Sequence, residues 1–230
     1  MVTIRSCSLL IGEPAPAAGR PPGRASHPGG LSLLMWRVLH THRVDDPFDF
    51  QALRIRQPGK LLPNRAAYEI FNEQRQLLAT ATETEAHHRL KLFSKPAPDA
   101  RVLAVTTAGS ALVLTMIKHH RERITDLHGP EGDLVGRIRA THTTRHYTLI
   151  DGEDQTVGKV VGDLALKRFS VTDGTGGEFA RVRKTWAGPK EMLTPSDHYR
   201  LEFTGPVSAT ARLLTVMMTI VLDLTLYEPS

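Results

Sequence analysis

A short pattern of residues recurs along this chain and constrains its fold more than any other feature. Asp151 is followed seven positions later by Gly158 and nine positions later by Val160. The segments that begin at Asp173 and Gly129 carry a small residue and a β-branched residue at the same two positions, and a looser copy begins at residue 107. The four starts are 22 residues apart, which indicates an internal repeat of one supersecondary unit.

Each unit is predicted to be a β-hairpin. Tyr147 and Leu149 alternate with polar residues before the turn at residue 151, and Phe169 and Val171 do so before the turn at residue 173. This alternation has the period of a strand, whereas a helix needs a period of about 3.6 residues. The Asp and Gly residues between the strands suit tight turns. Regular short strands joined in this way predict an antiparallel sandwich or barrel.

Small residues on the second strand of two hairpins point to a close neighbour. Gly136 shares a strand face with Ile138, and Gly158 shares one with Val160. A glycine inside a strand gives up packing, so it often marks the close approach of another backbone. We therefore expect Gly136 and Gly158 to face inward and to leave room for another element.

The C-terminal segment supplies a candidate for that element. Its uncharged run, residues 213–222, has ten residues between Arg212 and Asp223. A helix that is apolar all round is buried in protein or in a membrane, and a membrane span needs about 20 residues. We predict a buried core helix, although the β-branched residues of this run also fit a strand. The expected core positions are Leu213, Val216, Met217, Ile220, Val221 and Leu224.

The N-terminal part of the chain has a different composition. Residues 1–30 are rich in Pro, Gly, Ala, Ser and Arg, which bury too little apolar surface to offset the entropy of ordering. We expect residues 1–60 to be a disordered tail and residues 61–230 to form the barrel domain. The apolar run at residues 7–11 is too short for a secretory signal, so we expect a cytoplasmic protein.

Most of the net charge of +5 lies in this tail. Residues 1–63 hold eight basic and four acidic residues, and the remaining residues hold 21 basic and 20 acidic ones. A nucleic-acid-binding domain carries positive charge on its fold together with a recognisable motif, so we expect no nucleic-acid partner. The single cysteine, Cys7, excludes a disulfide framework.

Several segments resemble the phospholipid scramblases. They are YEIF at 68–71, LLA at 77–79, WAG at 186–188, DHYRLEF at 197–203 and LDLTLYE at 222–228, and the resemblance runs from about residue 61 to residue 228. The wider group includes the plant LURP-one-related proteins and the tubby C-terminal domains. The resemblance implies a closed antiparallel barrel of about twelve strands around a central, buried C-terminal helix. This fold agrees with the hairpins, the inward glycines and the apolar segment.

The chain departs from the animal scramblases in two respects. It has only Cys7 where those proteins carry a cysteine-rich run for palmitoylation. The stretch equivalent to their proposed calcium segment is residues 205–209, which contain no carboxylate, and Asp197 and Glu202 cannot supply the six to eight oxygens that calcium prefers. We therefore expect no cofactor and no metal, calcium included.

A set of basic residues on the outer face of the hairpins has the most functional promise. Strand alternation is predicted to turn these side chains outward, where they either keep the barrel soluble or bind anionic lipid headgroups. The headgroup candidates are Arg137, Arg139, Lys159, Arg181, Arg183 and Lys184.

The sequence contains no recognisable catalytic motif. Gly152 and Gly158-Lys159 lack the Ser/Thr of a phosphate loop, and no nucleophile motif is present. We expect a non-catalytic, scramblase-like protein that contacts anionic phospholipid peripherally, at the inner face of the plasma membrane. Phospholipid scrambling and phosphoinositide binding are implied by the resemblance alone. The alternative is a soluble binding or regulatory module whose barrel recognises a protein or a small ligand.

Overall fold

The computed structural model describes residues 46–58, 66–84, 100–119, 122–141, 145–185 and 198–226. These residues form twelve β-strands and one α-helix. In chain order they are β1 (Ala52–Arg56), β2 (Ala67–Asn72), β3 (Leu77–Glu83), β4 (Ala100–Thr107), β5 (Leu112–His119), β6 (Ile124–His128), β7 (Leu134–Ala140), β8 (His146–Asp151), β9 (Thr156–Gly162), β10 (Arg168–Thr172), β11 (Glu178–Thr185), β12 (His198–Phe203) and α2 (Ala209–Leu226).

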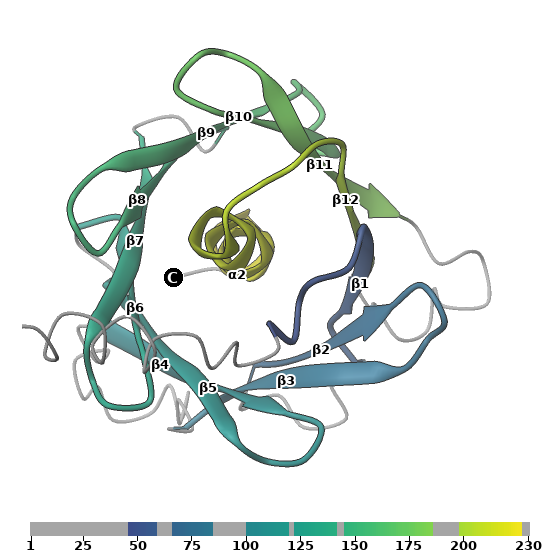
Figure 1. Cartoon of the computed structure of the whole chain (residues 1–230), viewed down its shortest axis with the longest axis vertical. Coiled ribbons are helices and arrows are strands. Elements are labelled where there is room, and N and C mark those ends of the chain that lie inside the picture. The colour runs from purple at the N-terminus through teal and green to yellow at the C-terminus, as the bar shows by residue number, and fades with distance from the viewer. Residues whose placement is uncertain are drawn as a thin grey trace, which may run out of the picture. The chain divides into compact units, whose positions relative to one another are not determined.

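The strands form one closed antiparallel barrel in which each strand lies beside its neighbours in sequence (Figure 1). β1 closes the ring because it pairs with both β12 and β2, and Leu53 lies opposite Leu201 on one side and Asn72 on the other. The mainly-β barrel expected from the sequence is confirmed.

The barrel begins earlier than residue 61. β1 lies at residues 52–56, and Phe48, before it, is fully buried in the core. Placing residues 1–60 in a tail is therefore wrong for their last part. The alternation of Leu53 and Ile55 with Arg54 and Arg56 is a strand pattern, and it lies before the predicted boundary at residue 61. Residues 1–45 lie outside the described residues.

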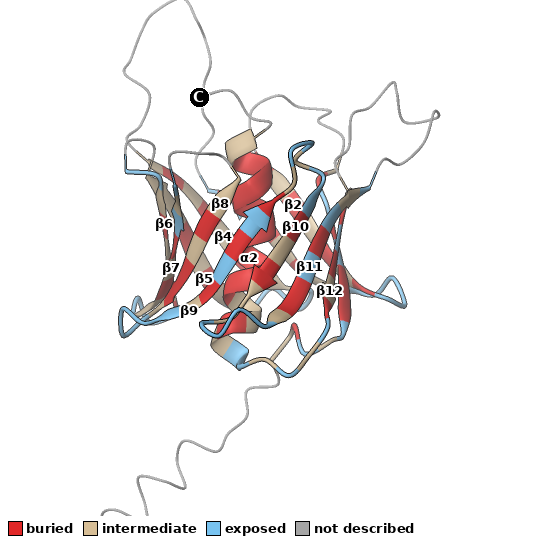
Figure 2. Ribbon diagram, turned by 90° about the horizontal axis from the view of Figure 1, so that it is seen from above, coloured by how far each residue is buried: buried red, intermediate tan, exposed pale blue. Residues whose placement is uncertain are grey.

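Helix α2 runs through the middle of the barrel (Figure 1), and its buried residues face the strands all round (Figure 2). It packs against β7, β8 and β12. Five of the expected core positions, all except Leu213, are buried, and Leu213 is half-buried against the core. The helix is longer than the uncharged run, since both Arg212 and Asp223 lie within it.

Hydrogen bonds satisfy groups at both ends of α2 and two of its buried polar side chains. The hydroxyl of Ser208 accepts the backbone N–H of Ala211 at 3.2 Å, which caps the first turn. Thr215 and Thr219 are fully buried and donate to the carbonyls four residues before them, at 2.6 and 3.2 Å. At the other end, Lys118 Nζ donates to the carbonyl of Leu224 at 3.3 Å.

Only one of the two inward glycines makes room for the helix. A Cβ at Gly136 would lie 2.5 Å from the carbonyl oxygen of Ile150 and 3.1 Å from a methyl group of Leu214 on α2. A Cβ at Gly158 would instead meet Leu149 at 3.1 Å and Phe179 at 3.4 Å, both on the barrel wall. The close approach at Gly136 is therefore to both β8 and the helix, and that at Gly158 is to neighbouring strands alone.

Five hairpin turns share one geometry and begin at residues 72, 107, 129, 151 and 173. In each, the N–H of the first residue donates to the carbonyl of the fifth, as from Asp173 to Gly177 at 2.9 Å. The fourth residue has a positive φ, which is 61° at Asp154 and 88° at Gly176. Because consecutive strands run in opposite directions, these turns all lie at the barrel end where α2 begins, and the β9–β10 turn lies at the end where α2 terminates (Figure 2).

Candidate functional site

The six basic residues expected on the outer face do not form one patch. Two of them are neutralised by carboxylates. Arg137 contacts Asp126 at 3.2 Å and also pairs with Asp154, and Arg181 pairs with Glu178 three residues before it. These pairs reduce the positive charge that either arginine offers to a ligand.

The expectation that Lys184 faces outward is wrong. Lys184 lies directly opposite Tyr199 in the register of β11 and β12, and partners in register share a face of the sheet. Tyr199 is buried inside the barrel, so Lys184 lies on the inward side, where its ammonium is 5.7 Å from the centre of the Tyr199 ring. The residue sits near the end of β11 and is half-buried at the rim.

Arg139, Lys159 and Arg183 are exposed as expected. Within the described ranges none of the three forms an ion pair. The register separates them, however. Arg139 and Lys159 flank Thr148 on β8, whereas Arg183 lies on β11 in a different row.

Arg183 belongs to a row of arginines whose other members are not among the six headgroup candidates. Arg183 lies opposite Arg168 on β10 and opposite Arg200 on β12, and Arg200 in turn lies opposite Arg54 on β1. All four residues are exposed. Neighbouring strands are about 4.8 Å apart, so the row extends over roughly 14 Å of the outer surface. We refer to Arg54, Arg168, Arg183 and Arg200 as the arginine row.

The arginine row carries little compensating charge. Glu202 pairs with Arg200 at 2.6 Å, but in the described part of the chain no carboxylate pairs with Arg54, Arg168 or Arg183. Like charges directly opposite one another in a sheet are destabilising. A barrel that needed only a soluble outer face would not gain stability from this arrangement, whereas an anionic ligand would relieve the repulsion.

Asp163 lies at the edge of the row, in the β9–β10 turn. Its carboxylate accepts the backbone N–H groups of Lys167 at 2.8 Å and Arg168 at 3.3 Å. The hydrogen bond from Lys167 is the largest cause that lowers the pKa of Asp163, and the positive charge of Arg168 lowers it further. The carboxylate thus holds the turn through backbone groups and makes no side-chain pair with the row.

Three of the four arginines are absent from the expected headgroup set, which is drawn from the second strands of the hairpins. Arg168 lies outward on the first strand of the hairpin that also holds Arg183. Arg168 opens β10, Arg200 lies in the DHYRLEF segment, and Arg54 lies before the expected domain boundary. The available signal was the alternation in each strand, which turns each of them outward. Their alignment depends on the strand register, which no single segment specifies.

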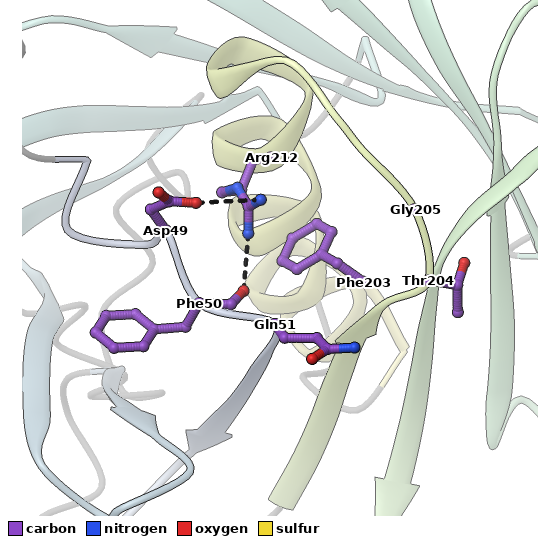
Figure 3. Close-up of a pocket in the computed structure, with 7 residues that line it drawn as sticks. All are labelled: Asp49, Phe50, Gln51, Phe203, Thr204, Gly205 and Arg212. Atoms are coloured by element: carbon purple, nitrogen blue, oxygen red, sulfur yellow. Dashed lines mark hydrogen bonds and ion pairs between the residues drawn. The ribbon is translucent and has the colours of Figure 1, made fainter.

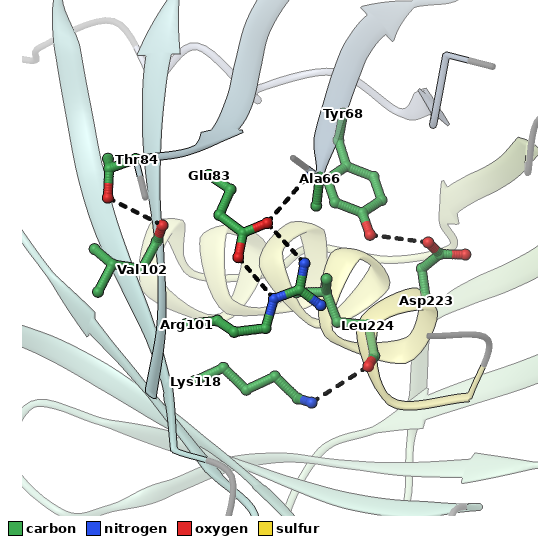
Figure 4. Close-up of polar contacts among 9 residues, drawn as sticks. All are labelled: Ala66, Tyr68, Glu83, Thr84, Arg101, Val102, Lys118, Asp223 and Leu224. Carbon is green, nitrogen blue, oxygen red and sulfur yellow. Dashed lines mark hydrogen bonds and ion pairs between the residues drawn. The ribbon is translucent and has the colours of Figure 1, made fainter. Parts of the chain in front are cut away.

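The inside of the barrel holds a second set of polar side chains (Figure 4). The carboxylate of Asp223 on α2 accepts the hydroxyls of Tyr68 and Tyr199, each at 2.8 Å. The buried carboxylate of Glu83 accepts Arg101 through Nε at 2.9 Å and Nη2 at 2.8 Å, and also accepts the backbone N–H of Ala66 at 2.9 Å. These groups satisfy one another, which is the arrangement expected of buried polar groups that stabilise a fold.

One cavity, of about 340 Å³, lies where α2 begins (Figure 3). The guanidinium of Arg212 lies over the ring of Phe203 at 4.4 Å, donates to the carbonyl of Phe50 at 2.8 Å and pairs with Asp49 at 3.3 Å. Close by, burial is the largest cause that raises the pKa of Asp46. Because Arg212 is committed to the segment before β1, it fastens that segment across the mouth of the barrel and leaves no free cation for a ligand.

The described residues do not group three or more His, Cys, Asp or Glu side chains in positions that could hold a metal ion. Glu202 is paired with Arg200. Asp197 and the WAG segment at 186–188 lie outside the described residues. By length and composition α2 could cross a membrane, but 67% of that span is buried in the barrel, as in any core helix.

The closed barrel and its central helix define a class of mainly-β proteins built around a buried helix. The chain belongs to the Scramblase family, whose sequence model matches residues 64–229. It is also similar to an X-ray structure of a protein from Arabidopsis thaliana, with 15% sequence identity and a TM-score of 0.48 over 78% of this chain and 95% of that chain. Curated protein sequences give no match.

Proposed function

We propose that this protein associates peripherally with membranes that contain anionic phospholipid, and that the arginine row is its contact surface. The observation that carries the proposal is the alignment of four exposed arginines across β10, β11, β12 and β1, only one of which has a carboxylate partner among the described residues. Membership of the Scramblase family supports a lipid-associated role.

The chemistry of the row suits phosphate. A guanidinium presents a planar fork of donors that matches a phosphate group, and it is more weakly hydrated than an ammonium. Each basic residue near an acidic leaflet contributes about 1 kcal/mol. Arg54, Arg168 and Arg183 together therefore favour binding by about 3 kcal/mol, which corresponds to roughly a hundredfold in affinity.

The proposed association is peripheral because the apolar helix α2 is already buried in the barrel core. Val216, Met217 and Ile220 have no exposed surface in the barrel, so insertion of α2 into a bilayer would empty the core. The proposal accordingly concerns lipid binding by the outer surface, and it assigns α2 no part in the movement of lipids across the membrane.

Vesicle flotation of the full chain tests the proposal. We expect binding to vesicles of phosphatidylcholine with phosphatidylserine, weakening as salt is added, and no binding to phosphatidylcholine alone. Calcium should not change the result, because residues 205–208 between β12 and α2 contain no carboxylate. If the wild-type protein fails to float with acidic vesicles, the proposal is wrong and the soluble binding module becomes the better hypothesis.

A matched pair of double variants locates the surface. Arg168→Gln with Arg183→Gln removes two charges from the row and should weaken binding about 30-fold, from about 2 kcal/mol lost. Arg139→Gln with Lys159→Gln removes the same charge from β7 and β9, and we expect it to weaken binding less than about threefold. Equal losses in the two variants would show that general positive charge, and not the row, makes the contact.

A further inference from the structure

Leu164 is the most exposed large apolar side chain in the described part of the chain. It lies in the turn between β9 and β10 with 88% of its surface exposed, whereas Leu77, Leu112 and Val161 are 39%, 41% and 47% exposed. Single surface leucines are common. This one stands out because it projects from a turn beside the arginine row.

The turn that carries Leu164 is held in one conformation. The N–H of Asp163 donates to the carbonyl of Arg168 at 2.8 Å, and the Asp163 carboxylate accepts the N–H of Lys167 at 2.8 Å. Leu166 has a φ of 55° and packs against the core, which anchors the turn. Because the turn is already ordered, a ligand that covers Leu164 meets little entropic cost.

The base of this turn carries the Asp163 carboxylate, which accepts backbone N–H groups, and three basic side chains. Lys167 is exposed within it, Arg168 begins β10 directly after it, and Arg183 lies opposite Arg168. In a membrane leaflet the phosphates lie at the surface and the acyl chains lie deeper. An apolar tip followed by arginines matches this order, with the tip in the acyl region and the arginines at the phosphates. A soluble phosphate ligand would be complementary to the arginines but would leave Leu164 in water.

We infer that the β9–β10 turn is a membrane-inserting tip, in which Leu164 enters the acyl region of an anionic bilayer while the arginine row contacts the phosphates. The inference rests on the proposed function and adds the orientation of the protein. The barrel end where α2 terminates faces the bilayer, and the five turns at residues 72, 107, 129, 151 and 173 face away from it.

A label at position 164 tests the insertion. The chain has a single cysteine, so Leu164→Cys in a Cys7→Ser background accepts one environment-sensitive fluorophore. We expect the emission to shift to shorter wavelength with acidic vesicles and to be quenched by lipids brominated in the acyl chain. Leu112→Cys is the matched control, because Leu112 is 41% exposed and follows the turn at residue 107, at the other end of the barrel. Its label should neither shift nor be quenched.

The affinity of an unlabelled variant provides the second measurement. Leu164→Ser should weaken binding to acidic vesicles about tenfold, which is about 1.4 kcal/mol, whereas Leu112→Ser should change it less than twofold. Binding of the wild-type protein with no shift at position 164 and no loss in Leu164→Ser would overturn the insertion and leave the proposed function standing. Absence of wild-type binding would overturn both.

Discussion

Aspartate side chains at the first position of three turns hold the local backbone in place. Asp151, Asp163 and Asp173 each accept the backbone N–H of the residue four positions later, at 2.8, 2.8 and 2.9 Å. Asp223 has a different role, since it is buried on α2 and accepts two tyrosine hydroxyls. A buried carboxyl group is costly unless it is hydrogen-bonded, so these hydroxyls explain how the core helix accommodates Asp223.

Asp173 gives the barrel a stability that depends on pH. The hydrogen bond from the Thr175 hydroxyl is the largest cause that lowers the pKa of Asp173, followed by the N–H of Gly177. A carboxylate with a lowered pKa in the folded state contributes stability above its ordinary value of 3.8, and this contribution is lost as the pH falls through the folded value. We expect Asp173→Asn to lower the urea midpoint at pH 7.

The same comparison at acidic pH provides the check. Below both pKa values the wild-type carboxyl is protonated in the folded and unfolded states, so the difference between wild type and Asp173→Asn should shrink. Asp163 also has a lowered pKa, but it is present in both proteins and its effect cancels. A difference in midpoint that stays constant from pH 7 to acidic pH would contradict this account.

At the scale of strands and helices, the sequence predicts what depends on neighbouring residues. Alternation and turn residues identify the hairpins, and the uncharged run identifies the core helix. The arginine row could not be predicted, because it depends on register across four strands. A β-bulge shifts that register between Val171 and Thr172 in the β10–β11 pair. The closing strand β1 was not expected, because its five residues lie before the predicted domain boundary at residue 61.

The turns offer a test of backbone conformation that leaves packing unchanged. Gly176 has a φ of 88°, and a Cβ there would meet nothing within 4 Å. Gly176→Ala should therefore cost about 1 kcal/mol through backbone strain alone. Gly174, in the same turn, also has open space where a Cβ would lie but has no positive φ, so Gly174→Ala should cost nothing measurable. Equal free energies of unfolding for the two variants would show that the turn does not require this φ.

At the scale of the whole molecule, the ring closes through a strand that lies near the start of the described chain. β1 pairs with both β12 and β2. Arg212 on the central helix contacts Asp49 and Phe50, which precede β1. Phe48, in that segment, is fully buried. The barrel, its helix and the segment at residues 46–51, which we call the N-terminal strap, therefore belong to one compact unit, from Val44 to Ser230.

Two truncated chains test whether the folded domain begins near Val44 or at residue 61. A chain that starts at Val44 keeps β1 and the strap, so its melting temperature should match that of the full chain within about 3 °C. A chain that starts at Leu61 loses β1, which leaves the edges of β2 and β12 unpaired, and exposed strand edges promote aggregation. We expect this shorter chain to show no cooperative thermal transition by circular dichroism. A cooperative transition in the shorter chain would mean that eleven strands close around α2 without β1, and the role assigned to Arg212 and its strap would then be wrong.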